Sequence, residues 1–544
     1  MKRRWFILTC LLTLFINACS DHTGTSRVPS IDAAVVEPAF SKMVEPVTLR
    51  VGMPIPSTLN NPVVRYIEEL SNVKAVLSWE AEGLDSYNQM VEMAIASKDL
   101  PDALIVNRSQ LRKLTEMDLI QDLSAVYETY ASKLVKDIYA STNNTVLHDA
   151  SIDGKLYGLP NVTFETDSHS LLWVRQDWLD KLHLPPPRTL TDVEQIAQSF
   201  INMDPDGDGK DNTIGLCGYR NIVYGKHPAI CGFDSVFHAF GAFPKNWIKD
   251  STGRILYGSI APENKQALSK LADWYKRGLI DNRFALNKNT HEPIYSNKTG
   301  LFFGPWWAPY WPLGDFNSID SSADWKAYPV PLKEDGKFVT HIAPVMNSYL
   351  VVRKGYPHPE AVVKVLNIET RLNRKQDPNN EKVKKLEDEL LRGGIQLRNY
   401  FPIDHLLDFT DAIEKRYVDV ESVLQGKKEP ASLDVESRLV YESIVQNKAH
   451  PKSNVYNSMT ALAFQTGVKA LVTTPMVKVR GVFYDTTDSM SKYRDELERL
   501  ENDTFLKIVM GELPVEAFDD YVKTWMDSGG GTITDEVKYA VTGK

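Results

Sequence analysis

Three short apolar runs decide the fold class: Val47–Met53 (VTLRVGM), Val73–Trp79 (VKAVLSW) and Ala103–Val106 (ALIV). Each has the length and composition of a β-strand, and the segments between them carry apolar residues at helical spacing. The first of these segments opens with Asn61-Pro62, an N-cap residue followed by a proline at the first helical position. This β-α-β-α-β alternation predicts an α/β layer with parallel strands.

The same alternation continues along the rest of the chain. Further strands are expected at Leu171–Arg175, Gly300–Phe303 and Ser348–Val352, and further helices at Thr191–Phe200, Pro262–Gly278 and Tyr493–Ile508. The charged stretch 372–399 is expected to form a solvated helix pair. A last helix is expected to open at Pro514 and to stop at the glycines 529–531.

Composition and charge exclude several classes of protein. The chain has 544 residues, of which 43% are apolar and 24% charged, and its net charge is −9. These are ordinary globular values, and at roughly 100–200 residues per domain the length suggests two to four domains. They exclude a disordered, collagen-like or polytopic membrane protein. The acidic balance argues against a protein that binds nucleic acid through its phosphates.

The N-terminus has the pattern of a secretory signal peptide. Three basic residues at 2–4 (KRR) precede an apolar run, Trp5–Ile16, which is too short to span a bilayer. Residues 16–19 (INAC) resemble a bacterial lipobox, which implies cleavage after Ala18 and a lipid on Cys19. Residues 1–18 would then be removed, and the protein would be exported and anchored to the outer face of the cell membrane. The alternative is a plain signal peptide with an incidental cysteine.

The segment that follows is expected to be a tether. Residues 20–46 are polar, contain scattered prolines and lack periodicity, so 19–46 is assigned as lipid anchor and flexible tether. Beyond it the chain has two cysteines, Cys217 and Cys231. They either form a disulfide, which an exported protein can keep, or stay unpaired in a buried segment, and the spacing does not decide between these.

The sharpest chemical motif is the acidic stretch DPDGDGKDN at residues 204–212. It resembles the first part of an EF-hand calcium loop, with carboxylates at positions 1, 3 and 5 and glycine at position 6. Three crowded carboxylates repel one another unless a hard cation neutralises them, and oxygen ligands without His or Cys favour calcium over zinc. The expected ligands of a structural calcium ion are Asp204, Asp206, Asp208, the Lys210 carbonyl and Asn212. Position 12 is Gly215 instead of the usual Glu, and the alternative is a solvated acidic turn.

The second motif is an aromatic segment, FFGPWWAPYWP, at residues 302–312. It directly follows an expected strand, and loops at strand ends are where open α/β sheets bind ligands. Its prolines break the alternation that core packing would favour and hold the aromatic faces rigidly. Trp306, Trp307 and Trp311 are therefore expected to line the ligand site, with at least two of them stacking on sugar rings, although aromatic clusters more often belong to a core.

No catalytic motif accompanies these two. The sequence lacks the nucleophile-elbow, zinc-protease, P-loop and dinucleotide-binding patterns, and its 11 histidines show no metal-binding spacing. No stretch singles out a pair of acids for glycoside hydrolysis. The protein is therefore not expected to be an enzyme.

Several motifs together resemble the extracellular solute-binding proteins of family 1, the binding lipoproteins of sugar ABC importers. Besides the lipobox they are DGKLYGLP at 153–160, LWVRQDWLDK at 172–181, YGSI at 257–260 and FGPWW at 303–307. The resemblance extends from about Val47 to the C-terminus. It is strongest to the long subgroup that includes alginate-oligosaccharide binders, which carry a calcium loop. Thr213 stands where those binders place an acidic ligand.

This resemblance implies a two-lobed α/β fold, the type II periplasmic-binding-protein-like fold, with the ligand in a cleft between the lobes. The first lobe would comprise 47–160 plus about 345–440, and the second lobe 161–344 plus about 441–544. Trp306 and Trp307 match the family's sugar-stacking segment. Cleft positions after strands and crossings add Asn107, Asn347 and Tyr484 as further ligand-binding candidates.

The function implied is capture of an oligosaccharide by a lipid-anchored, monomeric protein that delivers it to an ABC transporter permease. The alternatives are a surface polysaccharide-degrading enzyme and a peptide or small-molecule sensor lipoprotein. Which sugar is bound does not follow from the sequence, because the polar groups that select hydroxyls come together only in the fold.

Overall fold

The structure is a computed structural model that describes residues 37–53, 59–81, 83–225, 229–250, 252–316, 319–392 and 397–543. The expected signal peptide, residues 1–18, and Cys19 lie outside these ranges. None of the helices within them is both long and apolar enough to cross a bilayer.

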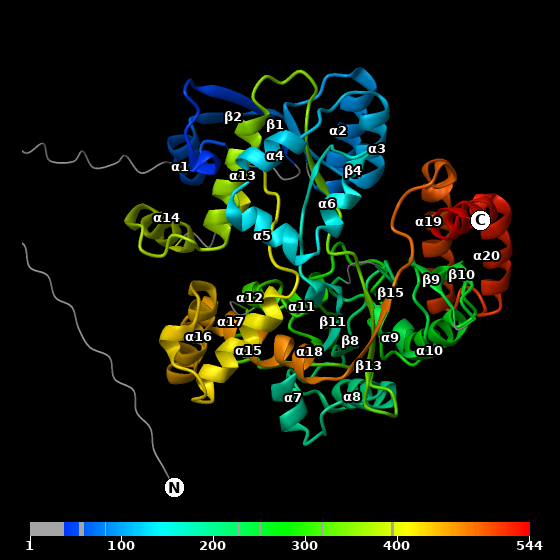
Figure 1. Ribbon diagram of the computed structural model, residues 1–544. Coiled ribbons are helices and arrows are strands. Elements are labelled where there is room, and N and C mark those ends of the chain that lie inside the picture. The colour runs from blue at the N-terminus through cyan, green and yellow to red at the C-terminus, as the bar shows by residue number, and fades with distance from the viewer. Residues whose placement is uncertain are drawn as a thin grey trace, which may run out of the picture. The chain divides into compact units, whose positions relative to one another are not determined.

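The first sheet contains the three strands that the alternation from Val47 to Val106 predicts, together with two strands from later in the chain (Figure 1). Its five strands run in the order β2-β1-β3-β14-β6. The bounds are β1 Val47–Met53, β2 Val73–Glu80, β3 Ala103–Val106, β6 Leu159–Pro160 and β14 Tyr349–Val352. β1 is parallel to β2 and β3, as the sequence predicts, whereas β14 is antiparallel to β3 and β6. β4 (Ser151–Ile152) and β5 (Lys155–Leu156) form a separate, two-stranded antiparallel hairpin.

The helices around this sheet share one hydrophobic core with it, and we call the whole the first lobe. They are η1 Pro38–Phe40, α1 Pro62–Ser71, α2 Leu84–Ser97, α3 Arg108–Glu116, α4 Ser124–Tyr130, α5 Lys133–Ser141, α6 Thr145–Asp149, α13 Pro359–Asn373, α14 Glu381–Arg392 and η4 Leu397–Tyr400. Asn61 caps α1 by accepting a hydrogen bond from the Val64 amide, as its position before Pro62 suggests.

The second sheet has four strands in the order β12-β7-β11-β8, and its core residues, with those of the helices around it, define the second lobe. The strands are β7 Leu171–Arg175, β8 Ile214–Leu216, β11 Thr299–Gly304 and β12 Trp325–Tyr328. Two-stranded sheets pair β9 (Trp247–Lys249) with β10 (Ile255–Tyr257), and β13 (Phe338–Ile342) with β15 (Met476–Arg480).

The remaining helical elements lie after Pro160 in the sequence. They are η2 Glu165–Ser168, α7 Gln176–Lys181, α8 Leu190–Met203, α9 Asp234–Ala239, η3 Gly258–Ile260, α10 Asn264–Lys276, α11 Glu292–Tyr295, α12 Leu313–Phe316, α15 Ala412–Leu424, η5 Pro430–Ser432, α16 Val435–Ala449, α17 Val455–Leu462, the π-helix η6 Ala463–Val468, α18 Lys469–Thr473, α19 Asp488–Val509, α20 Ala517–Trp525, the π-helical η7 Met526–Gly530 and α21 Gly531–Thr542.

Segments that run between the two sheets are hydrogen-bonded to one another. The Thr163 amide donates to the Val345 carbonyl at 2.7 Å. The Val162 amide donates to the Leu406 carbonyl at 3.0 Å, and the Glu165 amide to the Thr410 carbonyl at 3.0 Å. The chain therefore passes between the lobes through a set of paired crossings.

The structure corrects two expected boundaries. Residues from Pro38 onward are not a flexible tether: Ala39 is buried, and its carbonyl accepts a hydrogen bond from Asn367 Nδ2 at 3.0 Å. The first lobe's second segment does not extend to 440, because Ile413 and Tyr417 of α15 belong to a core of the second lobe. An amphipathic helix presents the same apolar stripe whichever lobe it packs on, so the sequence pattern does not show this.

Two expectations for helices also need correction. The described residues of the stretch 372–399 form the end of α13, the helix α14 and part of the short η4, rather than a pair of solvated helices. The helix that opens after Pro514 is interrupted at the expected place, because Ser528 and Gly529, with φ 114° at Gly529, leave helical angles. It is not the last helix, however: Gly530 and Gly531 take helical angles again, and α21 follows.

Candidate functional site

The aromatic segment starts within β11, and its residues 305–312 run in turns from the end of this strand to α12. The Ala308 amide donates to the Pro305 carbonyl at 3.1 Å, and the Tyr310 amide donates to the Trp307 carbonyl at 2.9 Å. Trp173 of the neighbouring strand β7 donates its Nε1 hydrogen to the Pro305 carbonyl at 3.1 Å. The segment is therefore held at the end of the second sheet by its own turns and by a strand beneath it.

Trp306 points into the protein and meets an acid from a crossing segment. Its side chain is 6% exposed and packs against Phe464 with a ring distance of 5.8 Å. Its Nε1 donates a hydrogen bond to Asp167 Oδ1 at 2.9 Å. Asp167 belongs to η2, just after the first crossing. Burial raises the pKa of Asp167 to about 6, although the Trp306 hydrogen bond and the Arg398 charge act in the opposite direction.

The other two tryptophans are more accessible. Trp307 is half-buried against the same core as Trp306. Trp311 is 38% exposed, and its ring packs edge-on against His291 at 5.3 Å. The three rings thus differ in burial: Trp306 is part of the core, whereas Trp307 and Trp311 offer accessible surface.

Charged side chains surround the crossing segment of Asp167. Glu165 forms ion pairs with Lys478 and with Arg480, the latter at 2.6 Å. Burial opposes ionisation of Glu165, but the hydrogen bonds from these two cations outweigh it and lower its pKa. Burial raises the pKa of Glu414, on α15, to about 6. A set of carboxylates with perturbed pKa values, paired with cations and next to an aromatic loop, is typical of a binding site.

Sequence reasoning missed this charged set. Asp167 and Trp306 are 139 residues apart, and Glu165 and Lys478 are 313 residues apart. The available signal was the position of the two acids directly after the DGKLYGLP segment, which the family resemblance marks as a crossing between lobes.

The three further ligand-binding candidates, Asn107, Asn347 and Tyr484, are hydrogen-bonded within the protein. Asn107 caps α3: its Oδ1 accepts from the Gln110 amide at 3.0 Å, and Gln110 Oε1 accepts from the Asn107 amide at 3.0 Å. Asn347 is hydrogen-bonded to Asn161, whose Nδ2 donates to Asn347 Oδ1 at 2.9 Å. The hydroxyl of half-buried Tyr484 donates to the Ile342 carbonyl at 3.3 Å.

An ion pair next to Asn107 joins the two lobes. Arg108 Nε, on α3, lies 3.0 Å from Asp485 Oδ1, in the segment after β15. Arg112 lies 3.6 Å from the same carboxylate. Val482 and Phe483, just before Asp485, pack on the core of the second lobe. Arg108 also pairs with Asp149 of the first lobe.

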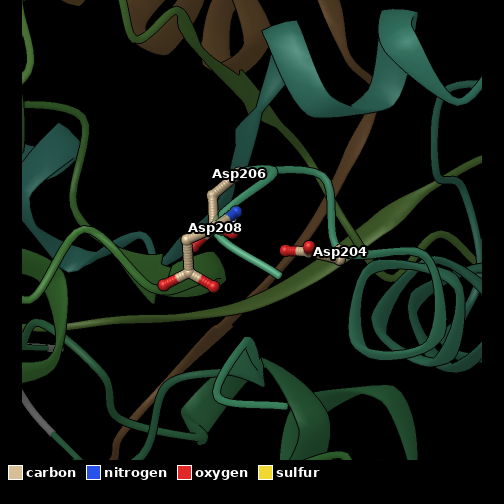
Figure 2. Close-up of side chains that lie close together, drawn as sticks. All are labelled: Asp204, Asp206 and Asp208. Carbon is tan, nitrogen blue, oxygen red and sulfur yellow. Dashed lines mark hydrogen bonds between the residues drawn. The ribbon is translucent and has the colours of Figure 1, made fainter. Parts of the chain in front are cut away.

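The acidic loop brings its three carboxylates together (Figure 2). One oxygen each from Asp204, Asp206 and Asp208 lies within 4.8 Å of the others. The loop folds on itself through its own carboxylates: Asp204 Oδ2 accepts from the Gly209 amide at 2.8 Å, and Asp208 Oδ1 accepts from the Lys210 amide at 2.8 Å. The hydrogen bonds from Lys298 and Asn212 lower the pKa of Asp208 to about 2.

These residues fit a hard cation. The convergent donors are carboxylate oxygens without nitrogen or sulfur, which is the donor set that calcium prefers. Asn212 lies at the same place and donates its Nδ2 hydrogen to Asp208 Oδ2 at 3.1 Å. Thr213 Oγ1 is buried and has no hydrogen-bond partner among the described residues. The carbonyl of Lys210 already accepts from the Asn212 amide at 3.0 Å, and its second lone pair is left for a cation.

Cys217 and Cys231 form a disulfide with a Cα distance of 5.4 Å, so the bridged alternative is the correct one. The Cys217 amide donates to the Leu301 carbonyl and the Cys231 amide to the Phe303 carbonyl, both at 2.8 Å. The bridge therefore lies beside β11, immediately before the aromatic segment. A disulfide is typical of proteins that work outside the cytosol.

Comparison with known proteins gives a consistent result. Residues 54–368 match the family model described as bacterial extracellular solute-binding protein. The chain is 22% identical over 489 residues to the polygalacturonan/rhamnogalacturonan-binding protein YtcQ of Bacillus subtilis (strain 168), covering 88% of this chain and 87% of that protein. It is 23% identical over 307 residues to the lipoprotein LipO of the same organism, covering 55% of this chain and 56% of LipO.

Among solved structures, the chain is similar to a crystal structure of the alginate-binding protein AlgQ2 without calcium ion. The TM-score is 0.60 at 16% identity, and the match covers 92% of this chain and 98% of that chain. A likeness at this identity concerns the fold. It confirms the expected two-lobed α/β architecture.

Proposed function

The chain belongs to the bacterial extracellular solute-binding proteins, and from this premise we propose that it captures an oligosaccharide and delivers it to the permease of an ABC importer. Members of this family bind solutes and are not enzymes, which agrees with the lack of a catalytic motif in the sequence. The proposal concerns the ligand, its site, the anchor and the transporter.

The observation that carries the proposal is the contact between Trp306 and Asp167. It joins the aromatic segment of the second lobe to a crossing segment, at 2.9 Å. Flat aromatic faces stack on the apolar faces of sugar rings, while carboxylates and cations take the hydroxyls. Trp307 and Trp311, the more accessible rings, are the proposed stacking platforms, and Trp306 supports them while it orients Asp167. Asn107, Asn347 and Tyr484 would act mainly by shaping the walls of the site.

Movement of the lobes would close the site on its ligand. The hydrogen-bonded crossings, such as Thr163 with Val345, are the proposed hinge, since a few element-terminal residues can absorb a rotation between lobes. The ion pair between Arg108 and Asp485 would form or strengthen on closure, because it connects the two lobes.

Relatives support a carbohydrate ligand. YtcQ is a polygalacturonan/rhamnogalacturonan-binding protein and AlgQ2 is an alginate-binding protein. The mixture of carboxylates and cations around Asp167 suits a sugar rich in hydroxyls. Glu165 offsets only one of the two positive charges of Lys478 and Arg480, so this trio keeps a net positive charge, which an uncharged or an acidic sugar could meet.

Calcium at the acidic loop is the proposed structural cofactor. Asp204, Asp206 and Asp208 would hold it with the Lys210 carbonyl and Asn212, and the buried Thr213 hydroxyl is a further oxygen beside them. A bound calcium ion would supply positive charge that offsets the repulsion of the carboxylates. The loop leads directly into β8, so the proposed role is to stabilise the second lobe.

The anchor and the assembly complete the proposal. A lipid on Cys19 would hold the protein on the outer face of the cell membrane, and the similarity to the lipoprotein LipO supports this. We propose that the protein works as a monomer that meets the permease through its folded lobes.

A binding screen tests the function. Isothermal titration against oligomers of galacturonate, rhamnogalacturonan, alginate and fructan should find at least one ligand with a Kd of about 10 µM or lower. New reducing ends should not appear during incubation with these oligomers. Binding of peptides in place of all sugars would support the sensor alternative, and release of reducing ends would support the enzyme alternative.

A further inference from the structure

Lys298 lies against the acidic loop although it is distant in sequence. Its ammonium group donates to Asp206 Oδ2 at 2.9 Å and also to Asp208 Oδ2. The Lys298 side chain is 25% exposed and that of Asp206 is 10% exposed, so the contact is largely shielded from water. A shielded ion pair is stronger than a surface pair.

Lys298 contacts the carboxylate oxygens that do not accept from the loop's backbone. Asp206 Oδ1 accepts from the Asp208 amide at 3.2 Å, and Asp208 Oδ1 accepts from the Lys210 amide at 2.8 Å. Each Oδ2 faces Lys298, and Asp208 Oδ2 also accepts from Asn212 Nδ2 at 3.1 Å. A calcium ion would need these same Oδ2 atoms.

The backbone fixes Lys298 in this place. Its carbonyl accepts from the Ile214 amide at 2.8 Å, and its own amide donates to Ser296 Oγ at 3.3 Å. Ile214 starts β8, to which the acidic loop leads, so Lys298 is tied to the end of the loop. Lys210, by contrast, is 72% exposed and lies 3.8 Å from Asp208.

We propose that Lys298 is the resident counter-ion of the acidic loop and competes with calcium for the carboxylates of Asp206 and Asp208. The inference rests on the proposed calcium site. It follows that the loop keeps its fold without metal, because an ammonium group already offsets part of the carboxylate charge. It also follows that Lys298 sets the calcium affinity.

Calcium titration of three proteins tests this competition. The wild type, Lys298→Met and Lys210→Met are freed of metal with a chelator and titrated with calcium chloride by calorimetry. Lys298→Met keeps the length of the side chain and removes the charge, so calcium should bind at least about tenfold more tightly than to the wild type. Lys210→Met should change the affinity less than about threefold, because its ammonium is exposed.

Melting in the presence of chelator gives a second reading. Lys298→Met should melt below both other proteins without metal, since the carboxylates of Asp206 and Asp208 then lose their counter-ion, and calcium should restore it. Lys298→Gln, which also lacks the charge, should behave in the same way if the Met variant does not fold.

The outcomes separate the two proposals. Equal calcium affinity of the wild type and the Lys298 variants would overturn the competition and leave the calcium site standing. If no variant takes up calcium, both the calcium site and the competition are wrong, whereas the oligosaccharide proposal is unaffected.

Discussion

Replacing Trp306 by phenylalanine tests the contact at the centre of the site. The change keeps an aromatic ring in a position that is 6% exposed, but it removes the Nε1 donor that Asp167 accepts at 2.9 Å. At neutral pH Asp167 is ionised, because its pKa is about 6. A hydrogen bond to a charged group contributes about 1.5–3 kcal/mol, so the variant should lose stability by about that amount.

The loss should depend on pH. Folding raises the pKa of Asp167 from 3.8 to about 6, so the folded state binds more protons between these values, and this group's contribution to stability falls as pH rises through them. At pH 5 the folded wild type carries a protonated Asp167, and the lost hydrogen bond is a neutral one of about 0.5–1.5 kcal/mol. The effect of Trp306→Phe should therefore shrink by about 1 kcal/mol between pH 7.5 and pH 5.

Urea unfolding followed by circular dichroism measures this difference at the two pH values. Trp307→Phe is the matched control, since it makes the same change at the neighbouring, half-buried ring. It should have a small effect that is the same at both pH values. If Trp306→Phe costs the same free energy at pH 7.5 and pH 5, the hydrogen bond to Asp167 does not act as described.

Two further predictions concern the lobes and the anchor. Asp485→Asn removes the carboxylate that lies 3.0 Å from Arg108 Nε across the lobes, so ligand affinity in calorimetric titrations should fall about five- to thirtyfold. The fall should be smaller at high salt, which screens the ion pair. The control Glu92→Gln breaks an ion pair within the first lobe and should leave the affinity unchanged. Equal affinity of the two variants would remove the ion pair from the closing mechanism. Cys19→Ser should move the protein from the membrane to the soluble fraction on cell fractionation, because an acyl chain supplies the membrane affinity, and a wild type that is already soluble would contradict the lipobox interpretation.

Strong local patterns made much of the fold predictable from sequence. The alternation from Val47 to Val106 gave β1, α1, β2, α2 and β3 close to their observed bounds, since the periods of strands and helices differ clearly over such lengths. The lobe assignment of α15 was wrong because Ile413 and Tyr417 would suit either core. The helix α21 was missed because a run of glycines more often follows a helix than starts a new one.

The site was predictable only where its residues are neighbours in sequence. The acidic loop and the tryptophans are local motifs, so both could be proposed from the sequence. Asp167 and Lys298 were missed, because their partners are 139 and about 90 residues away and only the fold brings them together. The capping role of Asn107 was readable, since Gln110 follows at the spacing of a capping box.

The central claim is that an oligosaccharide binds on the aromatic segment after β11. Calorimetric titration of Trp307→Ala with the oligosaccharide that binds the wild type tests it most directly. Trp307 is half-buried, so its loss should lower the melting temperature less than loss of the core residue Trp306 would. Loss of a stacking platform of about 2 kcal/mol should raise the Kd roughly thirtyfold. A variant that binds this oligosaccharide as tightly as the wild type would contradict the claim and place the ligand elsewhere.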